Sequence, residues 1–131
     1  MRWIVLPITL LLLLAGSGCL SPRNNYLEAR DFADLLKRDG LPVESIRVIP
    51  ADPFRASSAV AIKVGDSEIG VYKYDITSDF QKKRLEKIEK TKRIHIAGIP
   101  YPVKVYGSFM FFGLEKNKHK RAILETIKSF K

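Results

Sequence analysis

A single cysteine, Cys19, follows the longest apolar run of the chain, Ile4–Ala15, and this arrangement constrains the fold in two ways. One cysteine cannot form a disulfide within its own chain, so the folded part must be stabilised by packing. The apolar run has twelve residues, which span about 18 Å as a helix at ~1.5 Å per residue, whereas the hydrocarbon layer of a membrane is roughly 30 Å thick. Arg2 precedes the run, and the small residues 16–18 follow it. This order predicts a cleaved export signal rather than a permanent span.

The segment Ala15–Cys19 (AGSGC) resembles the lipobox of bacterial lipoproteins, with Gly16 standing where that family prefers leucine. The resemblance implies cleavage between Gly18 and Cys19, a diacylglycerol on the Cys19 sulfur and an acylated new amino group. It also implies a cell-envelope protein anchored on the extracytoplasmic side of a membrane. Leu20 is not aspartate, which implies the outer membrane if the organism is Gram-negative. Two alternatives stay open: a secreted protein with a free thiol, and an uncleaved anchor of seventeen residues extended to Leu20.

The resemblance divides the chain into three parts. Residues 1–18 are the expected signal peptide, residues 19–24 the lipidated N-terminus and a short tether, and residues 25–131 a single domain. The 113 residues from Cys19 onward are enough for one modest core. The tether from Ser21 to Asn24 spans at most about 13 Å when extended. A lipidated chain would therefore hold its folded domain near the membrane surface.

The pattern of apolar residues predicts three helices and five or six strands. The helices are expected at Asn25–Asp39, Ser78–Arg93 and Lys118–Phe130, with N-caps at Asn25, at Ser78 or Asp79, and at Asn117. The strands are expected at Val43–Ile49, Ala59–Val64, Glu68–Ile76, Val103–Tyr106 and Phe109–Leu114, with a further short one at Ile94–Ala97. This order predicts an α+β fold: one small domain whose antiparallel sheet is built from hairpins, with three helices packed mainly on one face.

The stretch Gly107–Gly113 (GSFMFFG) contains the turn before the predicted strand Phe109–Leu114 and most of that strand. It is similar to the aromatic strand of RNA-recognition domains, but no basic residue directly precedes its first glycine. Phe109 and Phe111 alternate with Met110 and Phe112, a pattern typical of a strand that is buried on both faces. Core packing is therefore the preferred interpretation of this segment.

Charge is distributed unevenly along the chain. Residues 19–80 contain eight basic and ten acidic residues, whereas residues 81–131 contain fourteen basic and four acidic ones. Such asymmetry predicts a polyanionic partner. For an exported and anchored protein we expect anionic lipid or an envelope polymer, and no nucleic acid. The residues expected to contact it are Lys82, Lys83, Arg84, Lys87, Lys90, Lys92, Arg93, Lys116, Lys118, Lys120 and Arg121. The alternative is that these side chains are only solvated, partly in i,i+4 pairs such as Lys82–Glu86.

No residue pattern predicts catalysis, a cofactor or a metal site. The only histidines, His95 and His119, are far apart in the sequence, and no nucleophile motif accompanies them. The domain is therefore expected to be non-enzymatic and to act by binding or scaffolding. The alternative is an exported module for a small ligand or polymer, using the strand face of Tyr72 and Tyr74 and the segment 101–106. A ligand-sized groove lined by these tyrosines favours the module, whereas a packed sheet with exposed basic helices favours the anchored scaffold.

Overall fold

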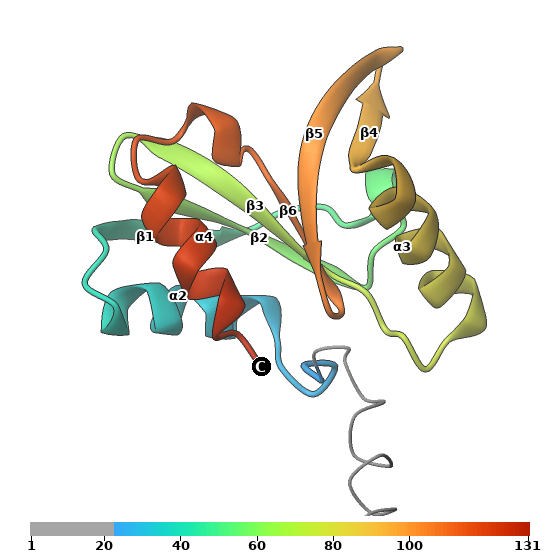
Figure 1. Ribbon diagram of the computed structural model, residues 1–131, viewed down its shortest axis with the longest axis horizontal. Helices are drawn as coiled ribbons and strands as arrows, with labels where there is room; N and C mark the ends of the chain where they lie inside the picture. The colour runs from blue at the N-terminus through green and yellow to red at the C-terminus, as the bar shows by residue number, and fades with distance from the viewer. Residues whose placement is uncertain (1–22) are drawn as a thin grey trace, which may run out of the picture.

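The computed structural model describes residues 23–131 and contains one six-stranded antiparallel sheet with three α-helices (Figure 1). The strands are β1 (Val43–Val48), β2 (Ser58–Val64), β3 (Ser67–Lys73), β4 (Arg93–Ile96), β5 (Ile99–Tyr106) and β6 (Phe109–Phe112). They are ordered β1-β2-β3-β6-β5-β4 across the sheet. The helices are α2 (Ala29–Arg38), α3 (Asp79–Thr91) and α4 (Lys120–Lys128), with the short 3-10 helices η3 (Asp52–Phe54) and η4 (Leu114–Lys116). The predicted small α+β fold is confirmed.

One face of the sheet is covered by α2 and α4. Alternate residues of a strand point to the same face, and Val60, Val71 and Phe111 are register partners on three adjacent strands. Together with the apolar sides of the two helices they form the larger core. Phe32 of α2 lies at its centre, with its ring centroid 4.9 Å from that of Phe111 and 5.1 Å from that of Phe130.

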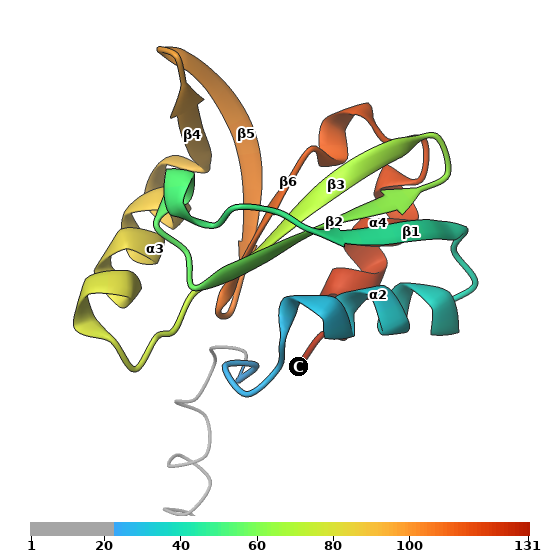
Figure 2. The same cartoon turned by 180° about the vertical axis from the view of Figure 1, so that it is seen from behind.

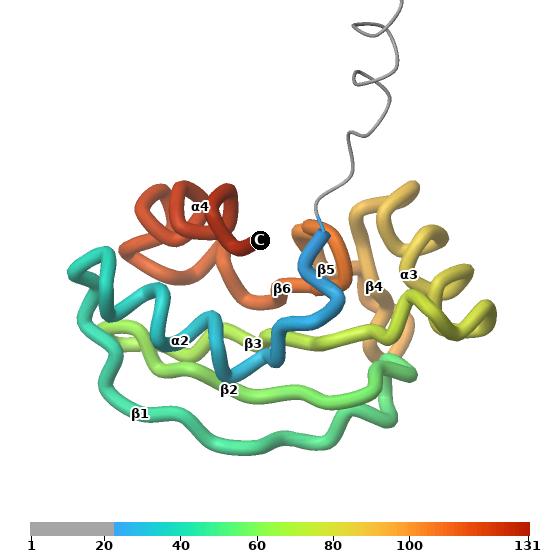
Figure 3. The backbone as a smooth tube through the Cα atoms, turned by 90° about the horizontal axis from the view of Figure 1, so that it is seen from below, coloured from blue at the N-terminus to red at the C-terminus, as the bar shows by residue number. Residues whose placement is uncertain are grey.

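The opposite face is covered by α3 and η3 (Figure 2). Ala59, Tyr72 and Met110 are register partners there, and they pack with Leu85 and Ile88 of α3 in a second, smaller core. Two of the three helices therefore share one face, and α3 lies on the other. Figure 3 shows α3 and α4 at opposite ends of the molecule, with the first described residues between them. The central strands are buried on both faces, as the alternation in Phe109–Phe112 predicts.

Helix α2 begins later than predicted, and its N-cap is Glu28 rather than Asn25. Glu28 and Asp31 form a reciprocal capping box, in which Asp31 accepts a hydrogen bond from the Glu28 backbone N–H at 2.7 Å. Asn25 makes a longer-range contact, since its side-chain oxygen accepts a hydrogen bond from the Ile76 backbone N–H at 3.2 Å. The asparagine predicted as the cap therefore holds the loop after β3, and the capping box of Glu28 and Asp31 begins the helix.

Strand β5 begins four residues earlier than predicted and includes two prolines. Proline has no N–H and is tolerated in a strand where no neighbour needs that donor. Pro100 and Pro102 pair only with β4, whereas β6 begins to pair with β5 at Val103. The prolines therefore lie in the part of β5 that has a neighbour on one side alone.

Candidate functional site

Helix α3 and the two residues that follow it carry seven of the eleven predicted contact residues, and the position of the helix is set by local signals. The Ser78 hydroxyl accepts a hydrogen bond from the Gln81 backbone N–H at 3.4 Å, which confirms the predicted cap. The helix ends where Lys92 adopts a left-handed conformation with φ 57°. Leu85 and Ile88 are the side chains that α3 buries against the sheet. The rest of its surface is polar.

Seven basic residues of α3 and its C-terminal end form what we term the α3 basic face: Lys82, Lys83, Arg84, Lys87, Lys90, Lys92 and Arg93. Six of them are exposed and Arg84 is half-buried. Within residues 23–131, none of the seven lies within 4.0 Å of a carboxylate oxygen, so the predicted i,i+4 pairs such as Lys82–Glu86 do not form. The α3 basic face is therefore a concentration of positive charge that close ion pairs do not neutralise.

Phe80, in the first turn of α3, has a different environment from the predicted one. With Leu85 and Ile88 it is one of the three residues of the predicted helix Ser78–Arg93 that are apolar enough to face a core, but 62% of its surface is exposed. The Arg55 guanidinium carbon lies 6.0 Å from the centroid of its ring. An exposed aromatic ring at one end of the α3 basic face adds an apolar group to a cationic surface.

The other predicted contact residues, Lys116, Lys118, Lys120 and Arg121, form what we term the η4–α4 cluster. Lys118 pairs with Asp66 at 3.0 Å, and Lys120 pairs with Glu115 at 2.7 Å. Half of this cluster is therefore matched by carboxylates of its own surroundings. Exposed pairs of this kind contribute little to stability, but they reduce the net charge that a partner meets.

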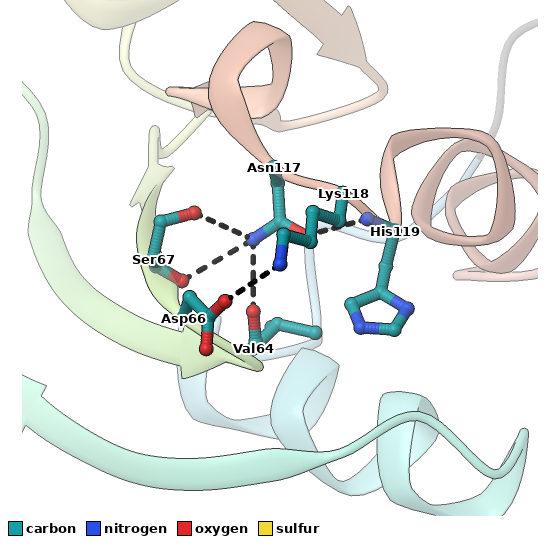
Figure 4. A network of polar contacts seen from close by, with 6 residues as sticks. All are labelled: Val64, Asp66, Ser67, Asn117, Lys118 and His119. Atoms are coloured by element: carbon teal, nitrogen blue, oxygen red, sulfur yellow. Dashed lines mark hydrogen bonds and ion pairs between the residues drawn. The ribbon is translucent and has the colours of Figure 1, made fainter.

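Asn117 holds the η4–α4 cluster beside the turn between β2 and β3 (Figure 4). Its amide nitrogen donates to the Val64 carbonyl at 3.0 Å and contacts both oxygens of Ser67 at 3.1 and 3.2 Å. Its side-chain oxygen accepts a hydrogen bond from the His119 N–H at 2.8 Å. The N-cap position of α4 is His119 rather than the predicted Asn117, which acts from two residues before it. Asn117 is a structural residue that links two distant parts of the chain.

The eleven predicted contact residues do not form one surface. Helix α3 packs on one face of the sheet, and α4 packs on the other. Figures 1 and 2 show η4 and the start of α4 at the end of the molecule remote from the first described residues. The structure therefore separates the α3 basic face from the η4–α4 cluster.

The N-terminal segment, residues 24–27, is fixed to the folded domain by its side chains. Asn24 is fully buried; its oxygen accepts a hydrogen bond from the Ser108 N–H at 2.8 Å, and its nitrogen donates to the Phe130 carbonyl at 2.9 Å. Lys73 Nζ donates hydrogen bonds to the backbone carbonyls of Asn25 and Leu27. Burial lowers the pKa of Lys73, while the nearby carboxylate of Glu28 opposes that shift.

The same segment is linked to the first turn of α3. Asn25 Nδ2 lies 3.5 Å from Asp75 Oδ1, and the Asp75 backbone N–H donates to the Gln81 side chain at 2.6 Å. Gln81 directly precedes Lys82 and Lys83. The segment that follows the predicted tether is therefore connected to the start of the α3 basic face. Cys19 itself lies outside the described residues, as do the predicted signal peptide and the first half of the tether, Ser21 and Pro22.

The tyrosines of the alternative interpretation are parts of the core. Tyr72 and Tyr74 are buried beneath α3 and η3, and the Tyr74 hydroxyl donates to the Phe54 carbonyl at 2.7 Å. Burial raises the pKa of Tyr72, and it raises the pKa of Tyr74 to about 12. Tyr106 is half-buried, and its hydroxyl donates to the Lys128 carbonyl at 2.9 Å. The face of Tyr72 and Tyr74 is not open to a ligand.

Two further classes of site have no counterpart in the part of the chain that the structure describes. From residue 23 to residue 131, no three histidine or acidic side chains gather in a way that could hold a metal ion. None of the helices in that range has the length and apolar character needed to cross a membrane.

Comparison of the chain with protein-family models, with curated proteins and with solved structures finds no match.

Proposed function

We propose that this chain is a small lipid-anchored protein of the bacterial cell envelope that binds an anionic membrane surface or envelope polymer through the α3 basic face. It acts by binding or scaffolding and catalyses no reaction of its own. The observation that carries the proposal is the contrast between the two basic groups. The η4–α4 cluster is partly neutralised by Asp66 and Glu115, whereas the α3 basic face has no close carboxylate partner in residues 23–131.

The energetics favour an orienting role for the α3 basic face. Each basic side chain close to anionic lipid contributes about 1 kcal/mol. The field of those lipids falls off over ~8 Å at physiological salt, so the charges act only if the domain is held close to the surface. The four residues between Cys19 and the buried Asn24 span at most about 13 Å when extended and would supply that proximity. Acyl chains at Cys19 would retain the protein on the membrane, and the α3 basic face would set which side of the domain turns toward it.

The geometry of the N-terminal segment supports the same orientation. Asn24 is hydrogen-bonded to Ser108 at the start of the folded domain. The next residue, Asn25, is connected through Asp75 and Gln81 to the first turn of α3. A lipid close to Asn24 would therefore bring Lys82 and Lys83 to the membrane before the η4–α4 cluster. The alternative of a ligand module using the tyrosine face gains no support, because Tyr72 and Tyr74 are buried.

Anchoring predicts a defined covalent form of the protein. Membrane-extracted wild-type protein is expected to lack Met1–Gly18 and to carry acyl chains on Cys19, as measured by intact mass and by mapping of the N-terminal peptide. The Cys19→Ser variant is expected to carry no lipid and to stay out of the detergent phase, because only the thiol accepts the diacylglycerol. A wild-type protein that is unmodified, or that retains Met1–Gly18, contradicts the anchor.

The proposed orientation of the domain on a membrane predicts that particular lysines are protected from chemical modification. On vesicles that contain phosphatidylglycerol, Lys82, Lys83 and Lys90 of the anchored protein are expected to react with an amine-acylating reagent roughly fivefold more slowly than on phosphatidylcholine vesicles, as about 1 kcal/mol per contact implies. Lys116 and Lys118 provide the internal control and should react equally on both. Equal reactivity of the α3 lysines on the two kinds of vesicle excludes the proposed orientation.

A further inference from the structure

A pocket of about 250 Å³ lies between α3, β4 and η3. Phe54, Ile88 and Ile94 supply apolar lining, and Arg84, Lys87 and Arg93 supply positive charge. Among the described residues, no acidic side chain lines it. An apolar wall beside several cations is a combination that suits an amphiphilic anion, because each half of such a molecule finds a matching surface.

The walls of the pocket are held in place by hydrogen bonds within the domain. At the junction of α3 and β4, the Thr91 hydroxyl donates to the Ile88 carbonyl at 3.3 Å and accepts from the Arg93 N–H at 3.4 Å. The η3 wall is fixed by the Tyr74 hydroxyl, which donates to the Phe54 carbonyl at 2.7 Å. A ligand would therefore meet a preformed site, which lowers the entropic cost of binding.

Arg84 is the residue that distinguishes this pocket from an ordinary charged surface. Its Nε atom is buried, and no hydrogen-bond acceptor lies within reach of it in residues 23–131. Buried donors in folded proteins nearly always have a partner, because leaving one unpaired is unfavourable. A bound anion would supply the acceptor that the chain itself does not, once the Arg84 side chain turns so that Nε faces the pocket.

We propose that this pocket binds a phosphate monoester with an apolar organic group. The phosphate would lie between Arg84, Lys87 and Arg93, and the organic group would lie against Phe54, Ile88 and Ile94. Three cations without an acidic neighbour favour a dianion over a single carboxylate, and guanidinium groups match phosphate oxygens in a paired geometry. The volume is slightly below the range of drug-sized sites, about 300–1,000 Å³, so it suits the phosphate and a short apolar part.

The proposal goes beyond the orientation of the domain on a membrane. It assigns a specific ligand chemistry to three members of the α3 basic face and does not require a lipid on Cys19. Lys82, Lys83 and Lys90 do not line the pocket and stay free for a surface. The ester has two possible sources, a soluble organic phosphate or the headgroup of phosphatidic acid, and each can be tested separately.

The first arm titrates the full-length protein with phenyl phosphate, followed by two-dimensional NMR and calorimetry, with phenol as the uncharged control. Wild-type protein and the Lys83→Gln variant are expected to bind, whereas Arg84→Gln is expected to bind at least about tenfold more weakly, because a charge-assisted hydrogen bond is lost. Both variants remove one positive charge from neighbouring positions, so the comparison isolates the pocket. Arg93→Gln, at an exposed position, provides a second pocket variant and should also weaken binding.

The second arm measures binding to vesicles that contain phosphatidic acid, with phosphatidylglycerol vesicles as the diester control. Loss of binding in Arg84→Gln but not in Lys83→Gln supports the proposal in either arm, and the arm in which it occurs identifies the source of the ester. Absence of saturable binding in both arms overturns it, as does an equal effect of the Arg84 and Lys83 variants. The lysine protection on phosphatidylglycerol is read from Lys82, Lys83 and Lys90, so failure of one proposal leaves the other measurable.

Discussion

Replacing Gly107 with alanine is expected to lower the free energy of unfolding by about 2 to 5 kcal/mol, because two penalties coincide at this position. Gly107 has φ +62°, a left-handed conformation that costs an L-residue roughly 1–2 kcal/mol. A Cβ atom there would lie 2.2 Å from the side-chain oxygen of Asn24, which is closer than real Cβ contacts come. Asn24 would have to move, and its hydrogen bonds to Ser108 and Phe130 would break at a further cost of about 1–3 kcal/mol.

Gly98 provides the matched control for this measurement. It also has a positive φ, +80°, but a Cβ atom built on it meets no other atom within 4 Å. Gly98→Ala should therefore show the backbone penalty alone, roughly 1–2 kcal/mol in urea-induced unfolding. In the Asn24→Ala background the effect of Gly107→Ala should fall to that of Gly98→Ala, since the steric partner is gone. Equal effects of the two glycine variants in the wild-type background contradict the proposed contact.

The contact between Asn24 and Gly107 illustrates what the sequence alone does not reveal. The glycine marks a tight turn between two apolar strands, and this turn is predictable because the signal lies within a few residues. Its steric partner lies more than eighty residues away. The same is true of Lys73, a lysine in an ordinary strand pattern that is buried because two carbonyls of the N-terminal segment accept its hydrogen bonds. Local periodicity predicts elements, but it does not predict which distant polar groups meet.

Most of the helices and strands are predictable because their signals are local. Helix α3 has its cap at Ser78, and the strand Phe109–Phe112 alternates as a strand buried on both faces should. The exceptions are β5, whose prolines resemble a turn, and α2, whose predicted cap Asn25 has a tertiary role. In both cases the outcome depends on which neighbours the segment has in the folded sheet.

The candidate site is likewise predictable from the sequence only in part. The sequence identifies both groups of basic residues, because composition alone reveals a positive C-terminal half. It does not reveal that Lys118 is paired with Asp66, since that ion pair depends on the turn between β2 and β3 lying beside η4. The pocket is likewise unpredictable from sequence, because Phe54, Arg84 and Ile94 come from three separate elements.

Raising the pH from about 9 to about 12 is expected to destabilise the folded protein by about 2–3 kcal/mol through Tyr74 alone. Tyr74 is fully buried, and burial raises the pKa of its hydroxyl to about 12, whereas an exposed tyrosine ionises near pH 10. Below about pH 10 the hydroxyl is neutral in the folded and unfolded chain, and its contribution is fully present. Above that pH the unfolded chain loses the proton first, so stability falls until the folded form also ionises.

Two other buried groups change the stability of the fold in the same pH range, and the direction of each change follows from the shift of its pKa. Burial also raises the pKa of Tyr72, so ionisation of this residue adds to the loss. Burial lowers the pKa of Lys73, so its contribution to stability rises with pH up to about 10.5 and opposes the two tyrosines only below that value. The net slope should therefore be steepest above about pH 10.5, where the tyrosines act without opposition.

The Tyr74→Phe variant isolates the Tyr74 contribution. At neutral pH it is expected to be about 1–3 kcal/mol less stable than the wild type, because the Phe54 carbonyl loses its hydrogen-bond donor. Its stability should nevertheless decline less between about pH 10 and about pH 12, since the ionisable group is absent. Tyr26→Phe, at a residue that is 71% exposed, is the matched control and should follow the wild-type profile. The measurement is the urea midpoint of unfolding across this pH range. If the midpoint of Tyr74→Phe falls with pH as steeply as that of the wild type, another group causes the loss of stability.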